Sequence, residues 1–132
     1  MLVKAKSITG RESFPVLVFI HGRGYAIGGN WWPQYDGAGI VKLLQDIGKP
    51  IISININYRL GVPGFLTNPE LRGAGYKPNN GLRDQQVALS WIKEHIKGFG
   101  GDPDNVTVAG QSGGGKKQVY ALRSSKTKVV AC

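Results

Sequence analysis

Hydrophobic residues gather in five places along this chain, and their spacing predicts three strands and two helices. Residues 16–20, 51–58 and 106–109 are rich in Val and Ile and are each bounded by Pro, Gly or Asn. Apolar runs of this length are typical of strands that are covered on both faces. Residues 37–46 and 82–99 instead repeat apolar side chains at every third or fourth position, which predicts amphipathic helices.

The order of these segments predicts an α/β fold. Strand, helix, strand, helix, strand is the alternation that builds a parallel sheet with flanking helices on both faces. A glycine-rich loop at 21–29 and a long loop at 63–80, with Pro and Gly, join the segments. Only 20 residues follow Ser112, which leaves room for one helix and no further crossover. Three strands would leave a sheet edge unpaired, and aggregation or partner binding through it is expected.

The most specific motif follows the third predicted strand directly. Gly110-Gln111-Ser112-Gly113-Gly114 fits G-x-S-x-G in the strand-to-helix context of a nucleophile elbow. Such a turn exposes the serine hydroxyl, and the backbone N–H of the next residue is a natural donor to an oxyanion. Further donors are expected from the loop at 21–24, because parallel strands end at the same edge of a sheet.

The two histidines lie on the wrong side of this serine for a catalytic base. His21 and His95 both precede Ser112, whereas the acid and histidine of such a triad follow the serine. We therefore expect His21 to be structural and His95 to pack on the apolar side of its helix. Arg83 and Asp84 open that helix, where a structural ion pair is expected.

These motifs together resemble the type-B carboxylesterase/lipase family of α/β-hydrolases. Residues 99–115 resemble the serine signature of the family, NYRLG at 57–61 and NGLRDQ at 80–85 resemble two further motifs, and residues 16–24 resemble its oxyanion loop. The resemblance covers residues 14–115 and implies a partial α/β-hydrolase fold, truncated at both ends. Residues 1–115 would form the central part of such a domain, and 116–132 a divergent basic tail.

The resemblance also implies a reaction and its residues. Ser112 would be the nucleophile, and the amides of Arg23, Gly24 and Gly113 would form the oxyanion hole. A carboxylic ester would be hydrolysed through an acyl-serine, with no metal and no cofactor. The triad acid and histidine are not expected in this chain.

The chain departs from the family pattern in four ways. Arg23 replaces a glycine of the oxyanion loop, and an arginine at positive φ would cost about 1 kcal/mol or more. Gln111 replaces the usual Glu before the serine and removes a negative charge, and Gly113 replaces the usual Ala. Two lysines begin the tail at 116–117, where the family has an apolar helix.

Charge and composition narrow the possible partners. The net charge is +9, but five of the 17 basic residues and none of the eight acidic ones lie in 116–132. A short basic tail is usually solvated, so no nucleic acid is predicted as a partner, only a small-molecule ester. No apolar run is long enough for a membrane span and no signal peptide is visible. A single cysteine leaves the compartment undecided.

Three alternatives stay open. An inactive fragment or pseudoenzyme would fit the missing base. A phosphate-binding loop would fit G-x-x-x-x-G-K at 110–116, although Lys117 stands where Ser or Thr should bind Mg²⁺. A dinucleotide loop would fit the glycines at 22, 24 and 28, although only Asp46 could meet a ribose.

Overall fold

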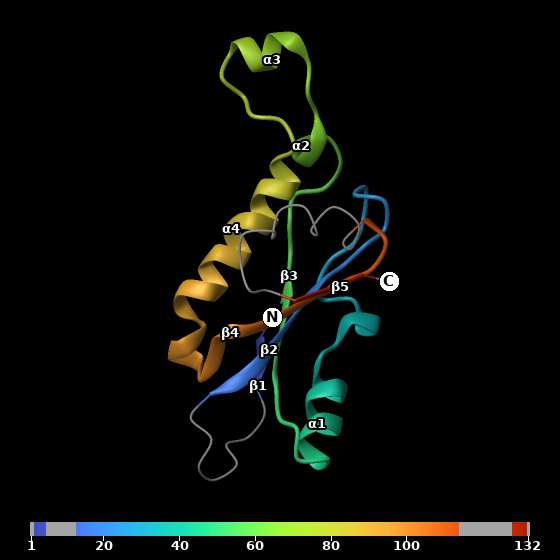
Figure 1. Ribbon diagram of the computed structural model, residues 1–132. Helices are drawn as coiled ribbons and strands as arrows, with labels where there is room; N and C mark the ends of the chain where they lie inside the picture. The colour runs from blue at the N-terminus through green and yellow to red at the C-terminus, as the bar shows by residue number, and fades with distance from the viewer. Residues whose placement is uncertain (1, 5–12, 114–127, 132) are drawn as a thin grey trace.

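A five-stranded, mostly parallel sheet forms the centre of the molecule (Figure 1). The computed structural model describes residues 2–4, 13–113 and 128–131. In spatial order the strands are β1 (Leu2–Lys4), β3 (Ile52–Ile56), β2 (Phe14–Ile20), β4 (Gly101–Gly110) and β5 (Lys128–Ala131). The inner strand β2 runs parallel to both β3 and β4. The predicted parallel three-stranded sheet is therefore confirmed.

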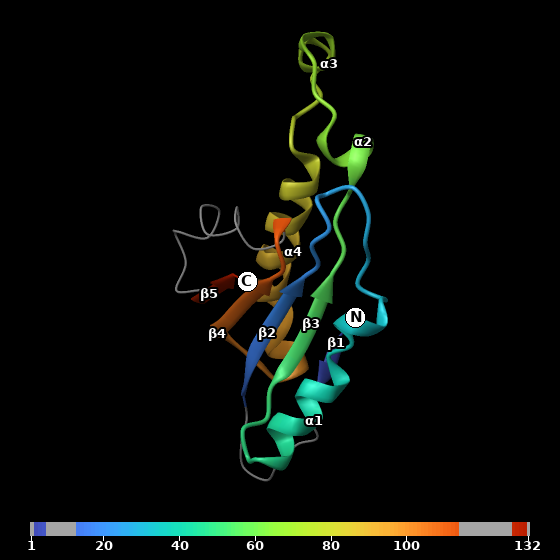
Figure 2. The same cartoon turned by 90° about the vertical axis from the view of Figure 1, so that its right-hand side faces the viewer.

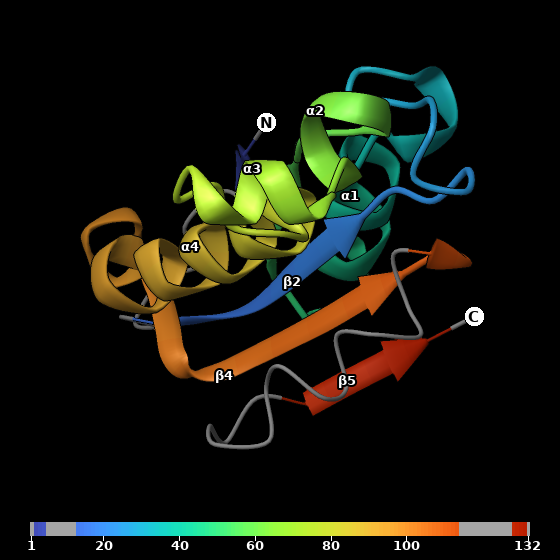
Figure 3. The same ribbon diagram turned by 90° about the horizontal axis from the view of Figure 1, so that it is seen from above.

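Two short strands cover the edges of this parallel core. β1 pairs antiparallel with β3, and β5 pairs parallel with β4. The expectation that no further crossover unit follows Ser112 is therefore wrong, because β5 adds a fourth parallel strand. Apart from β5, the basic tail predicted at 116–132 lies outside the described residues. The sequence analysis predicted an unpaired edge, whereas both outer strands of the parallel core, β3 and β4, are paired over part of their length. Figure 3 shows β5 alongside β4.

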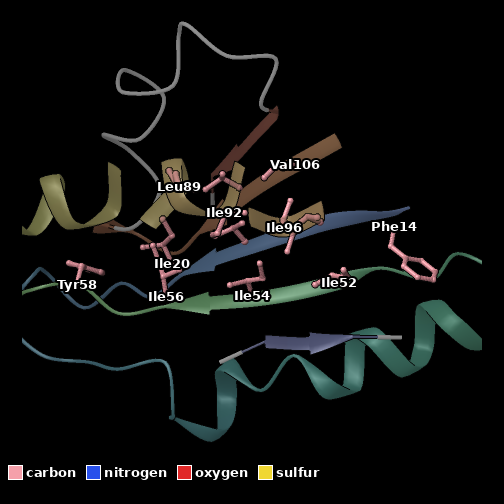
Figure 4. Packing of buried hydrophobic residues seen from close by; sticks show 13 residues of the cluster. Phe14, Ile20, Ile52, Ile54, Ile56, Tyr58, Leu89, Ile92, Ile96 and Val106 are labelled. Carbon is pink, nitrogen blue, oxygen red and sulfur yellow. The ribbon is translucent and has the colours of Figure 1, made fainter. Parts of the chain in front are cut away.

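Helices cover the two faces of the sheet, as the alternation predicts. α4 (Asn80–His95) lies against one face and continues into a 3₁₀ turn, η2 (Ile96–Phe99). α1 (Ala38–Asp46) lies on the other face, following the 3₁₀ turn η1 (Pro33–Tyr35). Figure 2 and Figure 4 show α1 and α4 on opposite sides of the strands.

The hydrophobic core fills the space between α4 and the sheet (Figure 4). Val18 of β2 lies between Ile54 of β3 and Val108 of β4 in the strand register, so the three side chains share this face. α4 and η2 contribute the buried side chains of Ile92 and Ile96. Alternate residues of β2 are buried on this side, and the residues between them are partly buried on the other, so the whole strand is apolar.

The segment predicted as one long loop contains two short helices. These are α2 (Gly61–Phe65) and α3 (Pro69–Gly73), and the latter projects well beyond the sheet (Figure 1). Asn68 caps α3 by accepting a hydrogen bond from the backbone N–H of Leu71 at 2.7 Å, and Pro69 takes the first helical position. Asn at the N-cap and Pro at the first helical position are a helix start. The sequence analysis took the prolines and glycines of this segment as signs of a loop and therefore missed α3.

The prediction for His95 is wrong. Its side chain is exposed and meets the ring of Trp91 edge-on, with ring centroids 4.8 Å apart. Trp91 and Phe99 are themselves 48% and 44% exposed. The apolar stripe of α4 is wider than the sheet beneath it, so only its centre is buried.

Candidate active site

Ser112 lies in a tight turn immediately beyond the C-terminal end of β4. Its φ is +51°, in the left-handed region, and its side chain is exposed. The backbone N–H of Gln111 donates to the carbonyl oxygen of Ile20 at 3.3 Å, which ties the turn to the end of β2. A non-glycine residue held at positive φ stores strain that is common at functional sites. The geometry is therefore that of a serine presented to solvent by a constrained turn.

The loop after β2 lies directly against this turn. A Cβ atom on Gly22 would collide with the carbonyl oxygen of Gln111 and lie 3.4 Å from Cβ of Ser112. Arg23, Gly24 and Tyr25 follow with φ angles of +74°, +65° and +64°. The strain expected for arginine at this position is thus present. The two turns that the sequence predicted to meet do meet in space.

Tyr25 joins the two turns, a contact that the sequence analysis did not predict. Its hydroxyl donates to the carbonyl oxygen of Gly113, and its ring packs on Phe65 with centroids 4.9 Å apart. Burial raises the pKa of the Tyr25 phenol. A Cβ atom on Gly113 would lie 3.1 Å from this ring, which is tighter than ordinary contact. Glycine in place of the family's usual alanine therefore makes room for Tyr25.

His21 is buried beneath the loop. Nδ1 lies 3.3 Å from the carbonyl oxygen of Gly22, and the ring stacks on Tyr58 with centroids 4.7 Å apart. The Tyr58 hydroxyl donates to the backbone oxygen of His21 at 2.9 Å, and burial raises its pKa to about 12. Burial lowers the pKa of His21, which favours the neutral form of its ring.

No general base contacts Ser112 in the part of the chain that the structure describes. His21 Nε2 is buried and has no hydrogen-bond partner among those residues, and His95 lies on the exposed end of α4. The Ser112 hydroxyl makes no hydrogen bond to any described side chain. The position of His21 fits the predicted structural role in the loop.

An ion pair connects the two remaining sequence motifs. The Arg59 guanidinium donates to both carboxylate oxygens of Asp84, at 2.8 Å from Nε and 2.6 Å from Nη2, and its backbone N–H donates at 3.0 Å. Hydrogen bonds from Arg59 lower the pKa of Asp84. A structural pair was expected at Asp84, and its partner is the distant Arg59 rather than a neighbour on the helix. Gly64 and Gly81 both approach the Arg59 carbonyl too closely for a Cβ atom.

A cavity of about 700 Å³ opens beside the serine turn, on the α1 side of the sheet. Its polar lining comes from Arg23, Gln34 and Gln111, and Phe19 and Tyr35 supply aromatic rings. The Tyr35 hydroxyl donates to Oε1 of Gln111 at 2.9 Å. The Arg23 guanidinium lies 4.6 Å from the centre of the Trp32 ring, within cation–π range.

Metal-binding clusters and membrane-spanning helices can be assessed only in the described segments. These segments contain no cluster of three metal-ligating side chains. None of their helices has the length and apolar character needed to cross a membrane. The phosphate-loop alternative depends on residues 114–116, which lie outside the described residues.

Comparison with known proteins places these features in context. The sequence profile described as the carboxylesterase family matches residues 3–130. A secreted lipase of Arthroderma benhamiae is 43% identical over 112 residues, and the para-nitrobenzyl esterase of Bacillus subtilis is 44% identical over 107. The matches cover 85% and 81% of this chain but only 20% and 21% of those proteins. The chain therefore spans about a fifth of the length of these relatives.

Solved structures agree with the sequence matches. A thermophilic pNB esterase superposes with a TM-score of 0.74 at 42% identity, over 86% of this chain and 22% of that one. A second pNB esterase gives a TM-score of 0.72 at 45% identity, over 86% and 23%. At this identity, the matched part of the chain has the fold of the corresponding part of an esterase.

Proposed function

The chain belongs to the carboxylesterase family, and from that premise we propose that it carries the nucleophile and the oxyanion hole of a carboxylic ester hydrolase. Ser112 is the nucleophile, and the backbone amides of Arg23, Gly24 and Gly113 are the oxyanion donors. The observation that carries the proposal is the contact between the strained turn at Ser112 and the loop at Gly22.

The proposed reaction follows from this arrangement. The Ser112 hydroxyl oxygen attacks the ester carbonyl carbon and the carbonyl electron pair moves onto the oxygen. The amides stabilise that negative charge while the C–O bond to the alcohol breaks. Water then releases the acid from the acyl-serine. Both steps need a base to accept and return a proton.

The absence of a base in contact with Ser112 among the described residues supports a second candidate function. The chain would bind esters or acids at the same site without efficient turnover, as the inactive fragment weighed above would do. In a complete site, the acid and the histidine would be residues that this chain does not contain. The rate of hydrolysis distinguishes the two candidates.

The experiment compares hydrolysis of 4-nitrophenyl butyrate by the wild-type chain, Ser112→Ala and Ser90→Ala. Ser90 is an exposed serine of α4 and serves as the matched control. We expect slow nitrophenol release that is lost in Ser112→Ala and kept in Ser90→Ala. The rate stays low because general-base catalysis, worth about 10²–10⁴-fold, is missing.

Two results would change the proposal. Equal rates for the wild type and Ser112→Ala would remove Ser112 as the nucleophile. Fast turnover that depends on Ser112 would mean that this chain contains a base, and the second candidate function would be rejected.

A further inference from the structure

Two of the four departures from the family pattern line the same cavity. Arg23 replaces a neutral glycine and adds a positive charge, and Gln111 replaces the usual glutamate and removes a negative one. Both changes shift the charge of the cavity in the same direction. Gly113 is not among the described residues that line the cavity, and the departure at 116–117 lies outside the described residues.

The Arg23 guanidinium is available to a ligand. Its side chain is exposed, and within the described ranges no carboxylate lies at ion-pair distance from it. It is held over the Trp32 ring, which positions the charge without neutralising it. None of the described residues that line the cavity is acidic.

The remaining lining suits the body of a small organic acid. Phe19 and Tyr35 supply aromatic surface, and the rings of Tyr35 and Trp32 are stacked with centroids 6.4 Å apart. Gln34 and Gln111 supply amide groups that can donate to oxygen. Because Tyr35 already donates to Oε1 of Gln111, the Gln111 amide nitrogen is the group that can donate to a ligand.

We propose that this cavity is a carboxylate-binding subsite, in which Arg23 anchors the free acid of an ester that also bears a second, reacting carbonyl. The matching substrates are monoesters of dicarboxylic acids with an aromatic or apolar body. The guanidinium forms paired, charge-assisted hydrogen bonds to the carboxylate. The ester group then lies toward Ser112, the residue after Gln111. The assignment rests on the proposed function for the reaction, but binding of the acid does not need turnover.

The strain at Arg23 supports this role. A glycine would take φ of +74° without cost, whereas a side chain there costs about 1–2 kcal/mol. Strained residues persist where a site uses them. The side chain that causes the strain is also the one that supplies the charge to the cavity.

The test is a titration of the isotope-labelled full chain, followed by NMR, with benzoate and with its neutral counterpart benzamide. We expect benzoate to bind at least about tenfold more tightly, with shifts at residues lining the cavity, since one strong charged contact is worth about that factor. Added salt should weaken the binding of benzoate and leave the binding of benzamide unchanged.

Three variants separate the cavity from general surface charge. Arg23→Gly relieves the strained φ and should bring the two affinities within about twofold. Gln111→Glu returns a negative charge that Tyr35 can still hydrogen-bond, and should weaken benzoate about fivefold. Arg83→Gln removes an exposed arginine of α4, outside the cavity, and should change neither affinity.

Several results would overturn the subsite. These are equal affinity for the two probes, no binding of either, shifts away from the cavity, or benzoate affinity that survives Arg23→Gly. Loss of the proposed esterase function would be seen separately, as equal ester hydrolysis by the wild type and Ser112→Ala, while benzoate binding would persist in both.

Discussion

The two faces of the sheet differ in how they are filled. The face under α4 is packed with aliphatic side chains, among which Val18, Ile92 and Ile96 are at most 2% exposed. The face under α1 carries polar groups, including Ser53 and Asn55, and contains the cavity beside Ser112. The same strands supply both faces, because successive residues of a strand point to opposite sides of the sheet.

We attribute the stability of the fold mainly to the α4 face and ligand binding to the α1 face. Close packing on the α4 face fixes the positions at which β2 and β4 end, and therefore the positions of the two turns. The α1 face leaves room for a ligand next to those turns. Asn55 shows the polar character of that face, since its side-chain amide donates to the backbone oxygen of Tyr35. We expect substitutions on the two faces to have different consequences.

The largest expected effect is a loss of stability on the packed face. Ile92→Ala should lower the free energy of unfolding by about 3 kcal/mol, because a buried cavity is left behind. Ile40→Ala, the same substitution in α1 at a side chain that is 42% exposed, should cost less than about 1 kcal/mol. Urea unfolding followed by circular dichroism measures both.

If Ile92→Ala does not fold, Ile92→Val should cost about 1 kcal/mol and keeps the comparison measurable. Equal costs at Ile92 and Ile40 would mean that the two faces are not packed differently.

The next effect is a dependence of stability on pH that comes from His21, whose ring stacks with the rings of Tyr58 and Tyr35. Burial lowers the folded-state pKa of His21, so the unfolded chain binds this proton first as the pH falls. Stability is therefore full above about pH 6.5 and falls below it, by at most about 1.4 kcal/mol per pH unit. Urea midpoints between pH 8 and pH 5 measure the slope.

His21→Phe keeps a ring against Tyr58 and should flatten that slope, whereas His95→Phe, at the exposed histidine, should not. An unchanged slope in His21→Phe would assign the pH dependence to other groups.

The smallest expected effect on stability is at the partly exposed ion pair between Arg59 and Asp84. Asp84→Asn weakens the pair with Arg59, whose side chain is 52% exposed, and should cost no more than about 1 kcal/mol. The pKa of Asp84 is lowered in the folded chain, so the pair stabilises above about pH 4 and is lost below it. Asp46→Asn, in the exposed pair with Lys42, is the control and should have less effect. A larger loss at Asp46 would contradict this order.

The sequence predicted local features of the fold better than contacts between distant residues. The apolar runs at 16–20 and 106–109 predicted the strands, and the motif at 110–114 predicted the turn that exposes Ser112. These features depend on local pattern and steric demand. The helices α2 and α3 were missed because each is only one or two turns long and contains proline or glycine.

The contacts of the site were harder to predict because they join residues far apart in the chain. Tyr25 and Gly113 are 88 residues apart, and Tyr35 and Gln111 are 76 apart. Nothing in the neighbourhood of either tyrosine indicates its partner. His95 was predicted wrongly for a related reason, since helical spacing shows which side is apolar but not how much of it the sheet covers.

The most direct test of the central claim, that the reactive group lies at the turn facing the open side of the sheet, is to locate the acyl group after reaction with 4-nitrophenyl acetate. Mass spectrometry of the tryptic peptide between Lys97 and Lys116 would assign the modified residue. We predict one acetyl group on Ser112, absent in Ser112→Ala and retained in Ile40→Ala. Acetylation at another residue, or equal labelling of Ser112→Ala, would contradict the account.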